Sequence, residues 1–407
     1  MFSKNPKKSL VLLLTIFLVV SAYIGYTAYL EWDEGSFLMN SRNIAGDTVN
    51  SEPSRPMALS FLISFIWKFT GESILFARLL TTVFGLGCIA LFYSICNEKF
   101  EDPIIPTLVF SLSPLILFWS SQVMTDIPGL FFLLSAYYFY LKRNDFMTGI
   151  SISFAITFRY IYSIFAVPFF IAYLLDREDI KDVLFYAGGG ILGAMPFFIY
   201  SFISHGGPLE KAFLYIGNVS EWSGASLFAS TWENLVKMIQ VFFALIPGVL
   251  KGRRETGSLE KITVVFYSLF ILLFVGMSFY RYWVPMIPFV IIIAYKGLDK
   301  KHFLVFSAIF LVVSGNLVYE EYQERKYCYQ EFMEGIEYLK EFDGGVVSDR
   351  WSITGYMLEQ KVLSPYKDYE LFKNRGMEYI FTTEKLDYPV KESFRGDVCT
   401  YYVYQLE

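Results

Sequence analysis

Glu31-Trp32-Asp33-Glu34-Gly35 follows directly on an apolar run, Leu10–Leu30, that contains no charged residue. A run of about 20 apolar residues is long enough to cross the hydrocarbon core of a bilayer as a helix. Three lysines among the first eight residues predict that its start lies on the cytoplasmic side. The adjacent carboxylates Asp33 and Glu34 are therefore expected outside, where charge beside a membrane is costly and often functional. The alternative is a solvated loop that only ends the helix.

The composition is typical of a polytopic membrane protein. Of the 407 residues, 55% are hydrophobic and 19% are aromatic, and the mean hydropathy is +0.43, values that soluble chains seldom reach. The formal charge of −5 is uneven, because residues 320–407 hold 18 acidic and 11 basic residues. The sequence shows no Cys/His metal spacing, glycine-rich nucleotide motif or basic patch, so it predicts no nucleic-acid partner.

The long apolar runs predict a mainly α-helical transmembrane bundle of about eleven spans. The expected spans are residues 10–30, 74–96, 104–124, 127–141, two short pieces within 146–175, then 183–203, 232–250, 262–279, 282–295 and 303–319. Arg159-Tyr160 interrupts residues 146–175, and one long helix is the alternative to two short ones there. The basic loops at 142–143, 251–261 and 296–301 then lie in the cytoplasm.

Met57–Phe69 is expected to lie along the outer membrane surface rather than across the bilayer. Its 13 residues make about 20 Å of helix, less than the hydrocarbon core of about 30 Å. Ser60, Ser64 and Lys68 recur every fourth residue and form a polar stripe opposite Phe, Leu, Ile and Trp side chains. This pattern is typical of an interfacial helix.

The acidic carboxyl-terminal part is expected to be a small soluble α/β domain outside the membrane. Its predicted strands are residues 345–348, 361–363, 379–381 and 399–405, and its predicted helices are 329–342, 351–359 and 369–375. The expected division is a transmembrane domain, 1–319, with an outer loop at 31–73, followed by the outer domain 320–407. Cys328 and Cys399 could pair if this domain faces an oxidising space, whereas Cys88 and Cys96 lie in an apolar run.

The conspicuous charges gather on the predicted outer side, at span ends or in outer loops. They are Asp33, Glu34, Arg55, Arg78, Asp126, Arg159, His205 and Arg281. Carboxylates can deprotonate an acceptor hydroxyl or hold a divalent metal, and arginines bind phosphate through paired hydrogen bonds. The combination favours a reaction of a lipid-borne phosphate at the outer face, since a transporter would place such groups nearer the bilayer midplane.

Taken in order, these motifs resemble the GT-C superfamily of membrane glycosyltransferases, and within it the protein O-mannosyltransferases and bacterial aminoarabinose transferases. The resemblance covers roughly residues 10–300. Its residues are Asp33-Glu34, Arg55-Pro56, Ala77-Arg78-Leu79, Leu112-Ser113-Pro114 with Thr125-Asp126-Ile127-Pro128, and Arg281-Tyr282-Trp283-Val284-Pro285 with Pro288. Met57 stands where the family usually has a second proline.

The resemblance implies transfer of a sugar, with inversion, from a polyprenyl-phosphate donor to an acceptor protein, lipid or glycan. Asp33 is the expected base, and Glu34 and Asp126 are further catalytic candidates. Substrate-binding candidates are Arg281, Arg55 and Arg159, which would hold the phosphate, together with Arg78, Tyr282 and His205. The cofactor is open; a divalent metal would be held by the three carboxylates.

The expected setting is the plasma membrane, with the amino terminus in the cytoplasm and the carboxyl-terminal domain outside. The alternative function is a transporter or lipid-glycan flippase without transferase activity. It would need ionisable residues deep within several spans, and residues 10–30, 104–124, 183–203 and 303–319 contain no Asp, Glu, Lys or Arg. A third possibility is a degenerate relative that binds a lipid-linked glycan without catalysis.

Overall fold

The computed structural model describes residues 6–177, 179–211, 213, 227–364, 376–396 and 399–406. The chain divides into two compact units: unit 1 comprises residues 1–25 and 78–318, and unit 2 comprises residues 26–77 and 319–407. The boundary between residues 318 and 319 lies one residue before the predicted start of the outer domain at residue 320. Unit 2 also takes in the loop that follows the first span.

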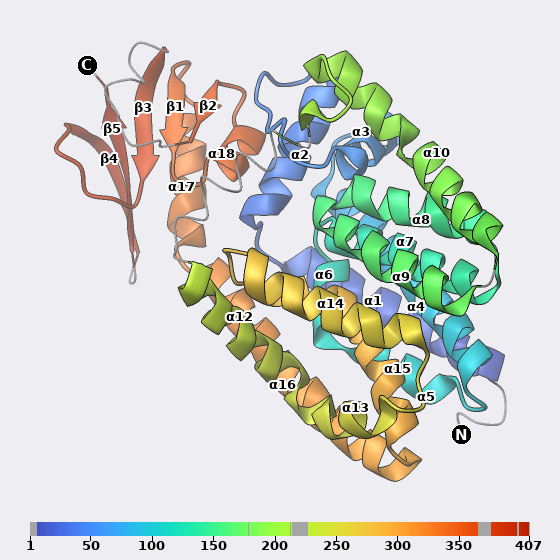
Figure 1. Cartoon of the computed structure of the whole chain (residues 1–407). Helices are drawn as coiled ribbons and strands as arrows, with labels where there is room; N and C mark the ends of the chain where they lie inside the picture. The colour runs from blue at the N-terminus through green and yellow to red at the C-terminus, as the bar shows by residue number, and fades with distance from the viewer. Residues whose placement is uncertain are drawn as a thin grey trace. The chain divides into compact units, whose positions relative to one another are not determined.

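Unit 1 is a bundle of helices (Figure 1). Its elements, three of which continue into unit 2 at their ends, are α1 (Pro6–Thr27), α4 (Ile74–Lys99), α5 (Ile104–Leu112), α6 (Pro114–Ser120), α7 (Asp126–Leu141), α8 (Asp145–Phe158), η2 (Tyr160–Phe165), α9 (Ala166–Asp176), α10 (Ile180–His205), α12 (Leu227–Phe242), η3 (Phe243–Leu245), α13 (Ile246–Gly252), α14 (Ser258–Phe274), η4 (Tyr280–Met286), α15 (Ile287–Gly297) and α16 (Lys300–Lys326). Helices α1, α4 and α16 each cross a unit boundary.

Among the described residues, five helices are long and apolar enough to cross a membrane: Pro6–Thr27, Ile74–Lys99, Ile180–His205, Ser230–Gly252 and Lys300–Leu339. The protein is therefore an integral membrane protein, while the number of eleven spans stays a prediction. Close helix packing within unit 1 depends on small residues. A Cβ at Gly149 of α8 or Gly189 of α10 would collide with the backbone of the other helix.

Three details of the helices test the sequence-based expectations. Residues 146–175 form two helices, as predicted, because Arg159 is extended (φ −150°, ψ 109°) and ends α8. The span expected at 104–124 is wrong as one continuous helix, since it breaks at Ser113 and restarts with Pro114, a residue suited to a first helical turn. The helix that contains the last predicted span continues beyond Tyr319, because α16 ends at Lys326.

The described part of unit 2 contains α2 (Trp32–Ala45), α3 (Ala58–Thr70), α17 (Tyr329–Leu339), α18 (Trp351–Met357) and five strands. The strands are β1 (Gly345–Ser348), β2 (Val362–Leu363), β3 (Met377–Thr382), β4 (Val390–Arg395) and β5 (Thr400–Gln405). They form one sheet of order β2-β1-β3-β5-β4, parallel from β2 to β3 and antiparallel thereafter, with α17 beside it (Figure 1). The α/β prediction is confirmed, although β4 was missed and the helix predicted at 369–375 lies outside the described residues.

The predicted short helix exists as α3, and its two faces differ as the sequence suggests. Ser60 and Ser64 are buried, and the Ser60 hydroxyl donates to the Phe37 carbonyl of α2 at 3.0 Å. Phe65 and Phe69 are 59% and 77% exposed. The two serines of the predicted stripe thus pack inside unit 2, whereas its third residue, Lys68, is exposed like Phe65 and Phe69. The position of α3 along the membrane surface stays a prediction.

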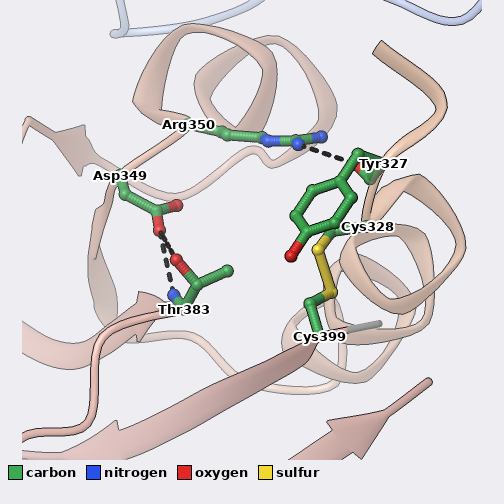
Figure 2. The surroundings of a disulfide bond; sticks show 6 residues. All are labelled: Tyr327, Cys328, Asp349, Arg350, Thr383 and Cys399. Atoms are coloured by element: carbon green, nitrogen blue, oxygen red, sulfur yellow. Dashed lines mark hydrogen bonds between the residues drawn. A yellow bond between two sulfur atoms is a disulfide. The ribbon is translucent and has the colours of Figure 1, made fainter. Parts of the chain in front are cut away.

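A disulfide joins Cys328 to Cys399, so the pairing that the sequence left open is present (Figure 2). Cys328 caps the amino-terminal end of α17, two residues after α16 ends, and Cys399 immediately precedes β5. The bond therefore ties the end of the last long apolar helix to the final strand of the sheet.

Candidate functional site

The acidic stretch is the amino-terminal end of α2 and not a solvated loop. Glu31 is the cap: its carboxylate accepts from the Asp33 backbone N–H at 2.8 Å, and its own N–H donates to the Glu34 carboxylate at 3.3 Å. This reciprocal capping box satisfies backbone donors that a helix start leaves open. Asp33 is 7% exposed and Glu34 is fully buried. The solvated-loop alternative is therefore wrong.

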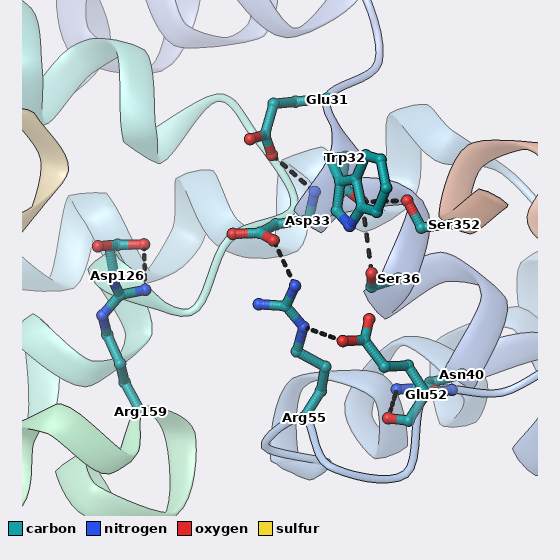
Figure 3. Close-up of polar contacts among 10 residues, drawn as sticks. All are labelled: Glu31, Trp32, Asp33, Ser36, Asn40, Glu52, Arg55, Asp126, Arg159 and Ser352. Atoms are coloured by element: carbon teal, nitrogen blue, oxygen red, sulfur yellow. Dashed lines mark hydrogen bonds and ion pairs between the residues drawn. The ribbon is translucent and has the colours of Figure 1, made fainter. Parts of the chain in front are cut away.

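Arg55 holds the Asp33 carboxylate (Figure 3). Its Nη2 lies 2.7 Å from Asp33 Oδ1, and its Nε lies 2.8 Å from Glu52 Oε1. Glu52 is fixed in turn by Asn40 of α2, which exchanges two hydrogen bonds with the Glu52 backbone at 2.7 and 3.1 Å. The guanidinium therefore sits between two largely buried carboxylates, and its fork fixes the direction of the Asp33 oxygen that it contacts.

Unit 1 brings together a second group of the predicted residues. Asp126 is the first residue of α7 and is fully buried; its Oδ2 lies 2.7 Å from Arg159 Nη1 (Figure 3). The Tyr162 hydroxyl donates to the Asp126 carbonyl at 2.9 Å. Arg159 reaches this position because α8 ends there and the chain turns into η2.

Arg281 and Tyr282 lie in η4 and extend the same group. The Arg159 guanidinium is 5.8 Å from the centre of the Tyr282 ring, and the Tyr282 carbonyl accepts from the Tyr267 hydroxyl at 2.7 Å. The Arg281 guanidinium lies 4.7 Å from the Phe279 ring centre and is 8% exposed as a residue. Two buried arginines on aromatic faces next to one carboxylate are suited to receive an anion.

The two remaining candidates have different surroundings. Arg78 of α4 is buried and donates from Nη1 to the Gly25 carbonyl of α1 at 2.7 Å. His205 is the last residue of α10, where its ring lies 6.1 Å from the Tyr200 ring. Arg78 thus bonds the end of the first span.

Sequence reasoning missed two polar residues beside these groups. Glu52 forms an ion pair with the same Arg55 that contacts Asp33. The sequence indicated this pair only through the spacing of three positions between Glu52 and Arg55. Lys237 of α12 lies 6.0 Å from the same Phe279 ring that contacts Arg281, and 5.0 Å from the Tyr280 ring. It was visible as a lone cation within an expected span. Across the described ranges, no three His, Cys, Asp or Glu side chains come together to hold a metal ion.

Comparison with solved structures defines the class of fold. ArnT from Cupriavidus metallidurans bound to undecaprenyl phosphate matches with a TM-score of 0.68 at 12% identity, covering 97% of each chain. Its apo state matches with a TM-score of 0.66. The Archaeoglobus fulgidus oligosaccharyltransferase complex with Zn and sulfate matches with a TM-score of 0.57 at 13% identity, covering 91% of this chain and 68% of that chain. The fold is that of the GT-C glycosyltransferases.

The sequence comparison adds a family match. The family model described as dolichyl-phosphate-mannose-protein mannosyltransferase matches residues 54–201. This segment contains Arg55, Asp126 and Arg159 and begins after Asp33. A search of curated protein sequences gave no match. The resemblance to GT-C glycosyltransferases is thus confirmed.

Proposed function

We propose that this protein is a membrane glycosyltransferase that moves a sugar from a polyprenyl-phosphate donor to an acceptor hydroxyl on the outer face. The observation that carries the proposal is the largely buried carboxylate of Asp33. It lies on the first turn of α2, directly after an apolar helix long enough to span a membrane, and Arg55 holds it there. The GT-C fold and the undecaprenyl phosphate bound to ArnT support a lipid-phosphate donor.

Asp33 would act as the general base. Its carboxylate takes the proton of the acceptor hydroxyl while that oxygen forms a bond to the anomeric carbon. The bond from this carbon to the phosphate oxygen breaks, and the electron pair leaves with the polyprenyl phosphate. A single displacement of this kind inverts the anomeric centre. Glu34 serves the capping box, so its part in the site is to fix the turn that carries Asp33.

Arginines would hold the phosphate and stabilise the charge that grows on it as the sugar leaves. Arg281 is the leading candidate, because its guanidinium is buried against the Trp119 and Phe279 rings, where its charge is poorly screened by water. Arg159 is paired with Asp126 and lies beside Tyr282, the residue after Arg281, so it would add positive charge next to Arg281. Arg55 contacts two carboxylates, which favours an orienting role on Asp33.

The direct test is transfer by the purified full-length protein in nanodiscs. Polyprenyl-phosphate sugars labelled in the sugar are supplied with mixed candidate acceptors, and release of polyprenyl phosphate and the anomeric configuration of the product are measured. The same reactions with EDTA test for a divalent metal. Transfer with inversion is expected. Absence of release with every donor, together with movement of labelled lipid across proteoliposomes, would instead establish the transporter or flippase alternative.

The outer location is tested separately. Single cysteines introduced in residues 320–407 and in the loop 251–261 are labelled in intact cells with a reagent that does not cross membranes. The proposal expects labelling of the carboxyl-terminal domain and not of the loop. The reverse pattern would place the Asp33 end of α2 on the cytoplasmic side and contradict the proposal.

A further inference from the structure

A pocket of about 170 Å³ opens within unit 2 next to the acidic stretch. Its lining residues come from the start of α2 and from the carboxyl-terminal part of the chain: Leu30, Glu31, Trp32, Arg325, Arg350 and Ile353. Pockets that take a whole small molecule measure about 300–1,000 Å³. This one is smaller, so it is suited to one group of a larger substrate.

Arg350 is the notable residue in the pocket wall. Its guanidinium donates to the Tyr327 carbonyl at 3.1 Å and lies 5.3 Å and 5.9 Å from the centres of the Phe332 and Tyr401 rings. Among the residues that the structure describes, no carboxylate lies within 4.0 Å of it. The adjacent Asp349 accepts instead from the Thr383 backbone N–H at 2.9 Å (Figure 2). Arg350 is thus held in place by groups that do not neutralise its charge.

The charged residues that line the pocket beside Arg350 are Arg325 and Glu31, and together they favour an anion. Arg325 adds a second guanidinium, which lies 3.4 Å from Glu321 on the same helix. The one carboxylate of the lining, Glu31, is engaged as the helix cap. Paired guanidinium groups bind carboxylate and phosphate oxygens with good geometry. Leu30, Trp32 and Ile353 supply apolar surface beside them.

The pocket is coupled to the proposed base through short links. Glu31 lines the pocket, and its carboxylate accepts from the Asp33 N–H. The Ser352 hydroxyl donates to the Trp32 carbonyl at 2.8 Å, and Arg42 of α2 donates to the Tyr356 carbonyl of α18 at 2.6 Å. These bonds hold α18, and Arg350 just before it, at a fixed place relative to the first turn of α2.

We propose that this pocket is an acceptor subsite that binds an oxyanion of the acceptor, a carboxylate or a phosphate, through Arg350 and Arg325. The proposal rests on the proposed transfer reaction, because an acceptor anchored here has its reacting hydroxyl near Asp33. The acceptor class is then one that carries a negative charge close to the hydroxyl that is glycosylated.

The first experiment measures anion binding without any transfer reaction. The full-length protein is treated with phenylglyoxal, which modifies arginine, and the rate at each arginine is followed by peptide mass spectrometry. Inorganic phosphate and acetate are the two anions, and glycerol is the neutral control. Arg395, exposed on β4 of the same unit, is the internal reference. Protection follows 1 + [L]/Kd, so about 10 mM phosphate binding with a Kd of about 3 mM slows modification of Arg350 about fourfold.

The expected result is slower modification of Arg350, and not of Arg395, with at least one anion. The anion that protects better shows whether a phosphate or a carboxylate is preferred. Equal rates at Arg350 with and without both anions, or equal slowing of Arg395, would overturn the subsite. Because this measurement uses the unaltered protein and no donor lipid, it stands even if no transfer is found.

The second experiment joins the pocket to the reaction. Arg350→Gln is expected to raise the KM for an anionic acceptor about tenfold or more, as the loss of a charged hydrogen bond of about 1.5–3 kcal/mol implies. The KM for the donor lipid should be unchanged, and Arg350→Lys should recover part of the effect. Arg395→Gln is the matched control on the same domain. A rise in the donor KM, or an unchanged acceptor KM in a folded Arg350→Gln protein, would contradict the assignment.

Discussion

The roles of the two adjacent carboxylates can be separated by Asp33→Asn and Glu34→Gln. Each change replaces one carboxylate oxygen with an amide nitrogen and keeps the shape of the side chain. Asp33 is the proposed base, whereas Glu34 accepts the Glu31 N–H in the capping box. Glutamine can fill that capping position as glutamate does. The first change should therefore remove catalysis, and the second should leave it almost intact.

The magnitudes follow from these contacts. General base catalysis contributes roughly 10²–10⁴-fold, or about 3–5 kcal/mol of activation free energy. Asp33→Asn also weakens the contact with Arg55, but Arg55 keeps Glu52 at 2.8 Å. A hydrogen bond to a charged group is worth about 1.5–3 kcal/mol, and the amide oxygen retains part of it. The melting temperature should then fall by only a few degrees, while kcat falls at least about 100-fold.

The assay is release of polyprenyl phosphate under single-turnover conditions, with thermal unfolding of each variant measured in the same detergent. Glu34→Gln is expected within about threefold of the parent, and Glu34→Ala should lose about 1 kcal/mol of stability with the cap. An Asp33→Asn protein that keeps its activity within a few-fold would refute Asp33 as the base. A large loss of kcat in a stable Glu34→Gln protein would move that role to Glu34.

Three further outcomes are expected elsewhere in the chain. Arg159→Met leaves the buried Asp126 carboxylate without its ion pair and should cost about 3–5 kcal/mol of unfolding free energy, partly restored by adding Asp126→Asn; an unchanged melting temperature would contradict this. Cys328→Ser opens a disulfide that spans 71 residues and should cost about 4 kcal/mol, seen as faster proteolysis of residues 320–407, and reductant should have no further effect on the variant. A bimane label on Phe65→Cys should be quenched by spin-labelled lipid more strongly than one on Ser64→Cys, and equal quenching would refute the interfacial orientation of α3.

The membrane helices were predictable because a continuous apolar run is sufficient to define them. The run length also identified α3 as too short to span. The apolar runs did not show their interior breaks: residues 104–124 contain no charged residue, so no charge marks the stop at Ser113. Proline at position 114 was the signal, because it cannot supply an N–H within a helix but suits a first turn.

Helix α2 was not predicted, and the reason is physical. Every residue from Asp33 to Ser41 is buried, so polar and apolar side chains alternate without the one-sided pattern of an amphipathic helix. The strand β4 was not predicted for the opposite reason. It lies at the edge of the sheet, where charged residues such as Lys391 and Glu392 are compatible with a strand. A periodic pattern of apolar residues identifies an element that buries one face and exposes the other. Neither α2 nor β4 is buried in that way, so neither has the pattern.

Within the candidate site, the residue types were predictable and their partners were not. The sequence places Asp33 and Arg55 in one outer loop, but it could not show that Arg55 is shared with Glu52. Nor could it show that Arg350, more than 300 positions from Trp32, shares a pocket with it. Such contacts depend on how α18 packs against α2, which no local pattern encodes.

Gly35, the last residue of the acidic stretch, lies where α2 packs against α18. A Cβ at this position would lie 2.7 Å from the Ile353 backbone nitrogen and 2.9 Å from its Cα, so α2 and α18 approach as closely as a glycine permits. Gly35→Ala must push the helices apart, and overpacking of this kind costs about 1–3 kcal/mol. A displacement of about 1 Å at Asp33, two residues away, can lower the rate about 100-fold.

Gly188→Ala in α10 is the control, because a Cβ there meets no atom within 4 Å and alanine should stabilise that helix by about 0.5–1 kcal/mol. Transfer and acceptor affinity should both fall in Gly35→Ala, since the helices that move carry Asp33 and the wall of the Arg350 pocket. Wild-type kinetics in that variant would mean that contact between α2 and α18 does not position the base.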